Sequence, residues 1–208
     1  YSYLLNTIFY KHNKISFIHS FFLGTTTIAI FSYSINLFIP LNIYITNFFF
    51  LFFTILGLTY FKNFLFYKYR LIILITLSVS FITTLSFPYN DYELYHLPYI
   101  EIIREFKIIF GLSNLDFRYA HSSVFQNISA FQHNFLMDKD SYIFYTPLLT
   151  VVSLKYMYEK LVNSNLNSIK LIGFITLIFF LIHGNRYGAL GNDLPAHLIA
   201  VISLILFI

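Results

Sequence analysis

The chain of 208 residues contains no cysteine, and charged residues make up only 11% of it. Without cysteine it forms neither a disulfide nor a thiolate metal site. It also lacks a glycine-rich phosphate loop, a nucleophile elbow and a helical HExxH zinc motif. These absences argue against ATP-driven transport and against serine or zinc hydrolysis.

Apolar residues dominate the rest of the sequence. Hydrophobic side chains account for 58% of the chain, and its mean hydropathy of +0.70 lies outside the usual range of soluble domains. Apolar runs of about 20 residues suffice for a helix to cross a bilayer. The sequence therefore predicts an all-α fold, a polytopic transmembrane helix bundle, with residues 1–208 forming a single transmembrane domain of a longer chain. About six spans are expected, over residues 15–39, 41–61, 71–87, 142–158 and 171–182, and after residue 197.

Two polar segments separate these apolar runs. Residues 88–140 carry seven acidic and four basic side chains, and we expect them to form an external loop. Helical spacing of apolar residues within it predicts two amphipathic helices lying on the membrane surface, the first with Pro98 in its first turn and the second near 119–136. Residues 183–197, with three glycines, are predicted to form a second external loop.

Basic residues are concentrated in three short segments, at 11–14, 62–70 and 155–170, although the formal net charge is only +4. Because Lys and Arg in short loops stay cytoplasmic, this distribution predicts a topology and not an anionic partner such as nucleic acid. Both polar loops are then expected to face the periplasm or exterior. The predicted location is the inner (plasma) membrane, as a multi-pass integral protein.

Asp91 and His96 are the candidate catalytic residues of the first loop. A carboxylate at this place would act as general base on an acceptor hydroxyl, or as ligand of a divalent cation such as Mg²⁺ or Mn²⁺. His96 would be its partner. The alternatives are a helix N-cap for Asp91 and a hydrogen-bonded interfacial residue for His96. Glu93 is expected to be a bystander.

Four further residues are predicted to bind substrate. Arginine suits bidentate capture of phosphate, so Arg118 is expected to hold a phosphate together with His121. Arg186 and Asp193, the two charged residues of the second loop, would form the facing wall. Two alternatives are open. The Arg118 side chain would instead extend to lipid headgroups, and Asp193 would instead cap a helix. His133 is expected to lie at the surface.

Three motifs carry a resemblance to a known family. They are Asp91-Tyr-Glu-Leu-Tyr-His-Leu-Pro98, Gly111-Leu-Ser-Asn-Leu-Asp-Phe-Arg118 and Gly191-Asn-Asp-Leu-Pro195. Together they resemble a group of bacterial integral membrane proteins with a DxxLYHLP motif, within the GT-C superfamily of multi-pass glycosyltransferases. The resemblance covers about residues 70–200.

The resemblance implies an envelope enzyme that transfers a sugar from a polyprenyl-phosphate-linked donor to an extracytoplasmic acceptor, with Asp91 catalytic. Membrane lipid and the lipid-linked sugar would be its partners. Two alternatives stay open. One is an envelope polysaccharide polymerase or ligase, which would depend more on Arg118 than on Asp91. The other is a non-catalytic membrane transporter or assembly protein, in which the charges line a pathway.

Overall fold

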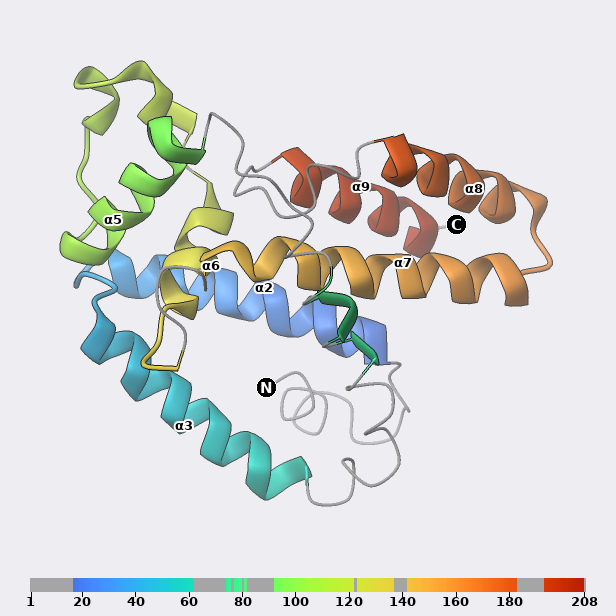
Figure 1. Ribbon diagram of the computed structural model, residues 1–208, viewed down its shortest axis with the longest axis horizontal. Helices are drawn as coiled ribbons and strands as arrows, with labels where there is room; N and C mark the ends of the chain where they lie inside the picture. Colours follow the sequence, from blue (N-terminus) through green and yellow to red (C-terminus); the bar gives the residue numbers. More distant parts are fainter. Residues whose placement is uncertain are drawn as a thin grey trace.

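The fold is taken from a computed structural model, which describes residues 17–61, 74–75, 77–79, 81, 92–121, 123–136, 142–182 and 193–207. The regular elements in these ranges are helices, as the sequence predicts (Figure 1). They are α2 (Phe17–Asn36), α3 (Ile43–Phe61), the π-helix η1 (Tyr92–His96), α5 (Leu97–Glu105), the 3₁₀ helices η2 (Leu112–Asn114) and η3 (Phe117–His121), α6 (Val124–Gln132), α7 (Tyr145–Asn163), α8 (Asn167–Ile182) and α9 (Asp193–Phe207).

The predicted transmembrane bundle is wrong. Within the ranges given above, no helix is both long and apolar enough to cross a bilayer. Helices α8 and α9 have 16 and 15 residues, short of the roughly 20 that a span needs. Helix α7 has 19 residues but includes Lys155, Glu159 and Lys160. The predicted location, a multi-pass protein of the inner membrane with its loops outside, is therefore wrong as well. The expected span 71–87 falls mostly outside the described residues.

Polar side chains within the apolar runs explain part of this difference. Ser32 and Asn36 of α2 are fully buried in the protein. The Asn36 amide donates hydrogen bonds to the carbonyl oxygens of Ile103 and Phe106, each at 3.1 Å. The end of α2 is thereby joined to the end of α5. These residues serve contacts inside the fold, which a hydropathy average does not reveal.

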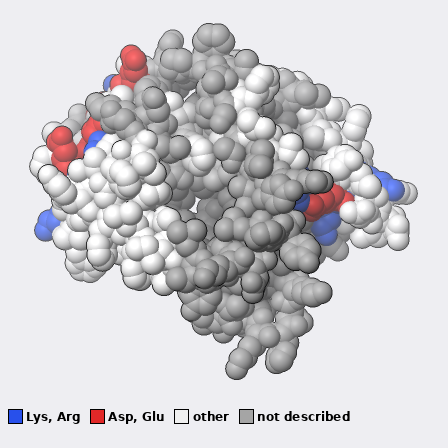
Figure 2. All heavy atoms as spheres, turned by 60° about the horizontal axis from the view of Figure 1, so that its bottom comes forward, with Lys and Arg blue, Asp and Glu red and all other residues white. Residues whose placement is uncertain are grey.

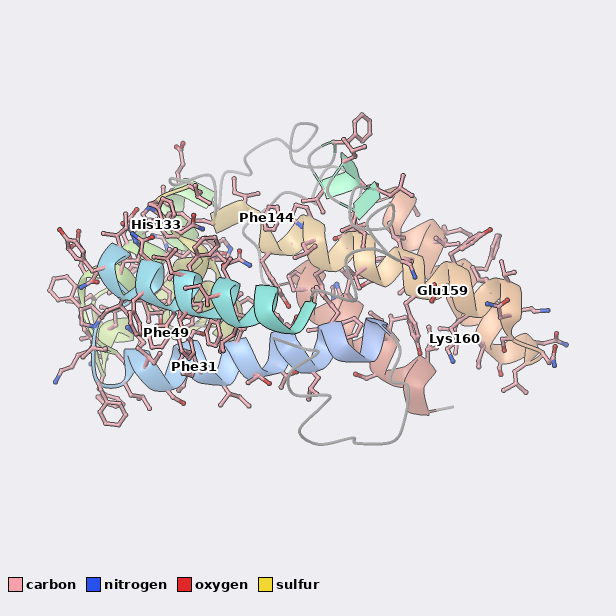
Figure 3. All side chains as sticks on the ribbon, turned by 90° about the horizontal axis from the view of Figure 1, so that it is seen from below. Phe31, Phe49, His133, Phe144, Glu159 and Lys160 are labelled. Carbon is pink, nitrogen blue, oxygen red and sulfur yellow. The ribbon has the colours of Figure 1, made fainter. Side chains whose placement is uncertain are left out.

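Two hydrophobic clusters form the core. In the first, α7 packs against α8 and α9, with Leu149 and Val152 of α7 and Ile202 of α9 among its buried residues (Figure 1). The second joins α5 and α6 to the adjoining parts of α2 and α3. There Phe31 of α2 and Phe49 of α3 meet edge to face, with ring centroids 4.9 Å apart (Figure 3).

Helix α6 differs most from its expected surface position. It begins with a capping box. The Ser123 side chain accepts a hydrogen bond from a backbone N–H in the first turn, and the Gln126 side chain accepts one from the backbone N–H of Ser123. Six consecutive residues, 126–131, are buried, because α6 packs against both α2 and α5. A helix lying on a bilayer would instead show one polar face. Helix α5 does begin with Pro98 in its first turn, as predicted, and buries Ile100 and Ile103.

Candidate functional site

Two of the predicted site residues, His96 and Arg118, lie near a ring contact between α5 and η3. His96 ends η1 directly before α5, and Arg118 lies in η3. The ring of Tyr99 on α5 lies 5.7 Å from that of Tyr119 on η3, measured between centroids. We call this surface, formed by η1, the start of α5, and η3, the η1–η3 face.

His96 is buried and held by the capping box of α6. The Gln126 side-chain oxygen accepts from the backbone N–H of Ser123 at 2.9 Å, which orients the amide. Its Nε2 group therefore donates to His96 Nδ1, at 3.2 Å. The side chain of His96 is only 5% exposed, with the Tyr95 ring 4.1 Å away. This hydrogen bond requires an unprotonated Nδ1 and joins η1 to α6.

Arg118 forms a bidentate ion pair with Asp116. Its Nη2 lies 2.9 Å from Asp116 Oδ2, and its Nε donates to Oδ1 at 3.1 Å. The same Oδ1 accepts from the Arg118 backbone N–H at 2.9 Å. These hydrogen bonds from Arg118 lower the pKa of the Asp116 carboxyl. The Arg118 side chain keeps 38% of its surface exposed, so a ligand in solution can reach it.

The structure does not describe the side chains of the other predicted site residues. Asp91 and Arg186 lie outside the described residues. His121 ends η3 and Asp193 begins α9, but neither side chain is described. Among the side chains that are described, no group of three His, Asp or Glu could hold a metal ion. The divalent cation at Asp91 and the facing wall of Arg186 with Asp193 remain predictions.

A second polar cluster was missed by the sequence analysis. Arg104 Nη1 lies 2.9 Å from Glu101 Oε2, and Arg104 Nη2 lies 3.3 Å from His133 Nδ1. The Tyr142 hydroxyl bonds to Arg104 and also to Glu101 Oε1, the latter at 3.3 Å. His133, expected at the surface, is only 3% exposed. The available signal was the pair Glu101 and Arg104, three residues apart on α5 and beside its buried isoleucines.

This cluster favours neutral Tyr142. Burial raises the pKa of the Tyr142 hydroxyl, an effect that the Glu101 carboxylate increases and the Arg104 guanidinium partly offsets. The hydroxyl therefore remains a hydrogen-bond donor at neutral pH. Since Glu101 and Arg104 also neutralise each other, the cluster supplies a fixed polar contact between α5 and the segment after α6.

Cavities lie beside the same segment. Figure 3 shows His133 at one end of the molecule, with Phe144 closer to its middle. The residues on either side of His133 in sequence, Gln132 and Asn134, line a cavity of about 430 Å³ whose remaining described lining is mostly aromatic and aliphatic. This volume lies within the range of about 300–1,000 Å³ typical of small-molecule sites. The lining residues are Ile28, Phe50, Phe53, Thr54, Phe131, Gln132, Asn134, Leu136 and Phe144.

Comparison with curated proteins and with solved structures gave no match. A family model does match, over residues 2–208, nearly the whole chain. The description of that family names no activity, so function has to be argued from the site itself. The chain belongs to the family described as a domain of unknown function, DUF8201.

Proposed function

We propose that this protein transfers a sugar from a polyprenyl-phosphate-linked donor to an acceptor hydroxyl. The observation that carries the proposal is the η1–η3 face, where the Tyr99 and Tyr119 rings bring the start of α5, which follows His96, next to η3, which bears Arg118. Asp91 directly precedes η1 in sequence. The resemblance of residues 91–98 and 111–118 to glycosyltransferase motifs supports the same activity. The proposal concerns this chemistry and not a membrane-spanning architecture.

Arg118 is the group proposed to bind the donor phosphate. Its guanidinium has five N–H donors, and Asp116 engages Nε and Nη2. No described residue engages the Nη1 donors, which the proposal assigns to an incoming oxyanion, while the ion pair fixes the plane of the guanidinium. Because the side chain is exposed, a phosphate can approach it without displacing a core contact.

Asp91 and His96 take different roles in this proposal. Asp91 would be the general base that accepts the proton of the acceptor hydroxyl. His96 is a positioning residue, because it is buried and its bond to Gln126 fixes η1 against α6. In this arrangement the hydrogen bond between His96 and Gln126 holds η1, the segment that follows Asp91 in sequence. The contact between the Tyr99 and Tyr119 rings holds the start of α5 next to η3, which bears Arg118.

The test is a transfer assay with a radiolabelled sugar on polyprenyl phosphate, using the full chain. We expect Asp91→Asn to lower the rate about a hundredfold or more, the usual contribution of a general base. Arg118→Ala should weaken donor binding at least about tenfold, the loss of a charge-assisted hydrogen bond of about 1.5–3 kcal/mol. Arg118→Lys should fall between this variant and the wild type.

The matched control is Lys170→Ala, which removes a positive charge from an exposed position on α8. Helicity of each variant is checked by circular dichroism. Full transfer by Asp91→Asn would overturn the proposal. An equal loss in Lys170→Ala and Arg118→Ala would contradict the assigned role of Arg118 and indicate a general effect of net charge.

A non-catalytic assembly protein is the second candidate, and exposed apolar residues favour it. One face of α3 presents Tyr44, Phe48 and Ile55, which are 82%, 62% and 61% exposed. We call this face the α3 stripe. Exposed apolar residues also occur on α8, while Figure 2 shows the described charged residues gathered toward two edges of the view. Large exposed apolar patches often mark interaction sites. Absence of transfer with every lipid-linked sugar would favour this candidate.

A further inference from the structure

Two cavities adjoin each other, the larger between α2, α3 and α6 and the smaller between α2, α6 and α7. The larger, of about 430 Å³, is the one beside His133. The smaller, of about 180 Å³, lies between α2 residues such as Thr25, the C-terminal part of α6, and Tyr145 in the first turn of α7. Ile28 and Gln132 line both cavities. The two spaces therefore meet at these side chains.

One buried polar atom at this junction lacks a hydrogen bond. Gln132 Oε1 is buried and has no partner in the part of the chain that the structure describes. The Tyr145 hydroxyl, which belongs to the smaller cavity alone, is buried as well, and the Thr25 side chain is its hydrogen-bonding neighbour. A buried acceptor without a donor is costly, and native proteins rarely leave one. The Gln132 oxygen therefore points to a bound hydrogen-bond donor at the junction.

The described lining favours a neutral group. It contains no Lys, Arg, Asp or Glu in either cavity. A phosphate or carboxylate here would find no counter-charge among the described lining residues, which is unfavourable in a mostly apolar site. Water alone can fill a small polar space, but the larger cavity is walled mainly by phenylalanine and aliphatic side chains, and apolar cavities tend to stay dry.

We infer that the linked cavities bind a neutral molecule with an apolar chain and a terminal hydroxyl, a long-chain alcohol. The chain lies against Phe50, Phe53 and Phe131 in the larger cavity. The hydroxyl donates to Gln132 Oε1 at the junction. This site is separate from the proposed phosphate contact, because Arg118 lines neither cavity. It therefore stands or falls independently of glycosyl transfer.

Three probes of one chain length test the inference on the unmodified protein. They are 1-octanol, octyl methyl ether, which cannot donate a hydrogen bond, and octyl phosphate, which is charged. Calorimetric titration should give a Kd for 1-octanol about fivefold lower than for the ether, the effect of one neutral hydrogen bond. Octyl phosphate should bind at least about tenfold more weakly than 1-octanol.

Variants then locate the site. Gln132→Leu should abolish the preference for 1-octanol over the ether, because it removes the acceptor and keeps an apolar wall. Ile28→Phe should reduce binding of both by filling the junction, whereas Ile175→Phe, at a position 56% exposed on α8, should leave binding unchanged. Equal affinity for alcohol and ether in the wild type would overturn the inference. So would tighter binding of octyl phosphate, or no binding of any probe.

Discussion

Hydrogen bonds to neighbouring residues determine what the individual site residues can do. His96 cannot face solvent freely, because it is buried and accepts from Gln126. Arg118 remains accessible, because its partner Asp116 lies only two residues away and covers one edge of the guanidinium. The two residues thus differ in accessibility, although the sequence predicted that both would face one site. The accessible arginine is the residue to probe with ligands.

The pH response of Asp116 follows from the same pair. Hydrogen bonds from Arg118 lower the pKa of the Asp116 carboxyl below its ordinary value of 3.8. A lowered pKa in the folded state means that this stabilisation is fully present above the ordinary pKa and is lost as pH falls through the lowered one. Carbon-detected NMR titration should therefore give a pKa below 3.8 in the wild type and a higher value in Arg118→Gln.

The control for this titration is Lys170→Gln, which removes a charge far from the pair in sequence and should leave the Asp116 pKa unchanged. Because both side chains of the pair are partly exposed, added salt should shrink the difference. An identical Asp116 pKa in the wild type and in Arg118→Gln would show that the ion pair is not maintained in solution.

At the scale of elements, the positions of the helices follow the apolar runs closely. The expected segments 15–39, 41–61 and 142–158 contain most of α2, α3 and α7. Pro40 and Asn42 fall between the first two helices as expected, and the Asn42 side chain accepts from the Ile45 backbone N–H at 3.1 Å. The apolar runs did not predict whether each helix packs against lipid or against other helices. Helix α7 buries residues against α8 and α9 rather than against lipid.

The packing of α7 gives a direct stability prediction. Leu149 is fully buried in the cluster shared with α8 and α9. Leu149→Ala should lower the free energy of unfolding by about 2–5 kcal/mol, the usual cost of a buried cavity. Leu171→Ala on α8, where the side chain is 59% exposed, is the matched control and should change it by no more than about 0.5 kcal/mol. Urea denaturation measures both. Equal small effects would mean that α7 does not form the centre of this cluster.

For the whole molecule, the apolar surface is the property that sets it apart. The α3 stripe lies on one helix, and Leu171, Phe174 and Ile182 of α8 are also more than half exposed. Figure 1 shows α3 and α8 on opposite sides of the α2 and α7 pair. Apolar surface of this kind drives association in water. The molecule therefore presents separate apolar faces that do not meet within one chain.

Removing part of the α3 stripe should reduce self-association. In Phe48→Gln with Ile55→Gln, both altered side chains are more than 60% exposed, so unfolding should be little affected. Sedimentation velocity should show a larger monomer fraction at a given concentration. The control pair is Tyr158→Gln with Val162→Gln on α7, 65% and 61% exposed. Sedimentation like that of the wild type would show that the α3 stripe does not mediate association.

Local patterns in the sequence were enough to predict where several helices lie and where some of them begin or end. Local signals suffice for this, such as apolar run length, the Pro40 and Asn42 turn, and Pro98 at the first turn of α5. The sequence also singled out the segment that contains His96 and Arg118, because charges are rare in so apolar a chain.

Which polar groups are buried, and what surrounds the apolar residues, depends on contacts between segments that are far apart in the sequence. Asn36 bonds to the carbonyl of Ile103, which lies 67 residues away, and His133 meets Arg104, 29 residues away. Hydropathy averages neighbours in sequence, whereas burial depends on partners that are distant in sequence. For that reason the sequence predicted membrane spans in place of a packed core. It also gave no sign of the cavities at Gln132, which form where α2 and α6 meet α3 on one side and α7 on the other.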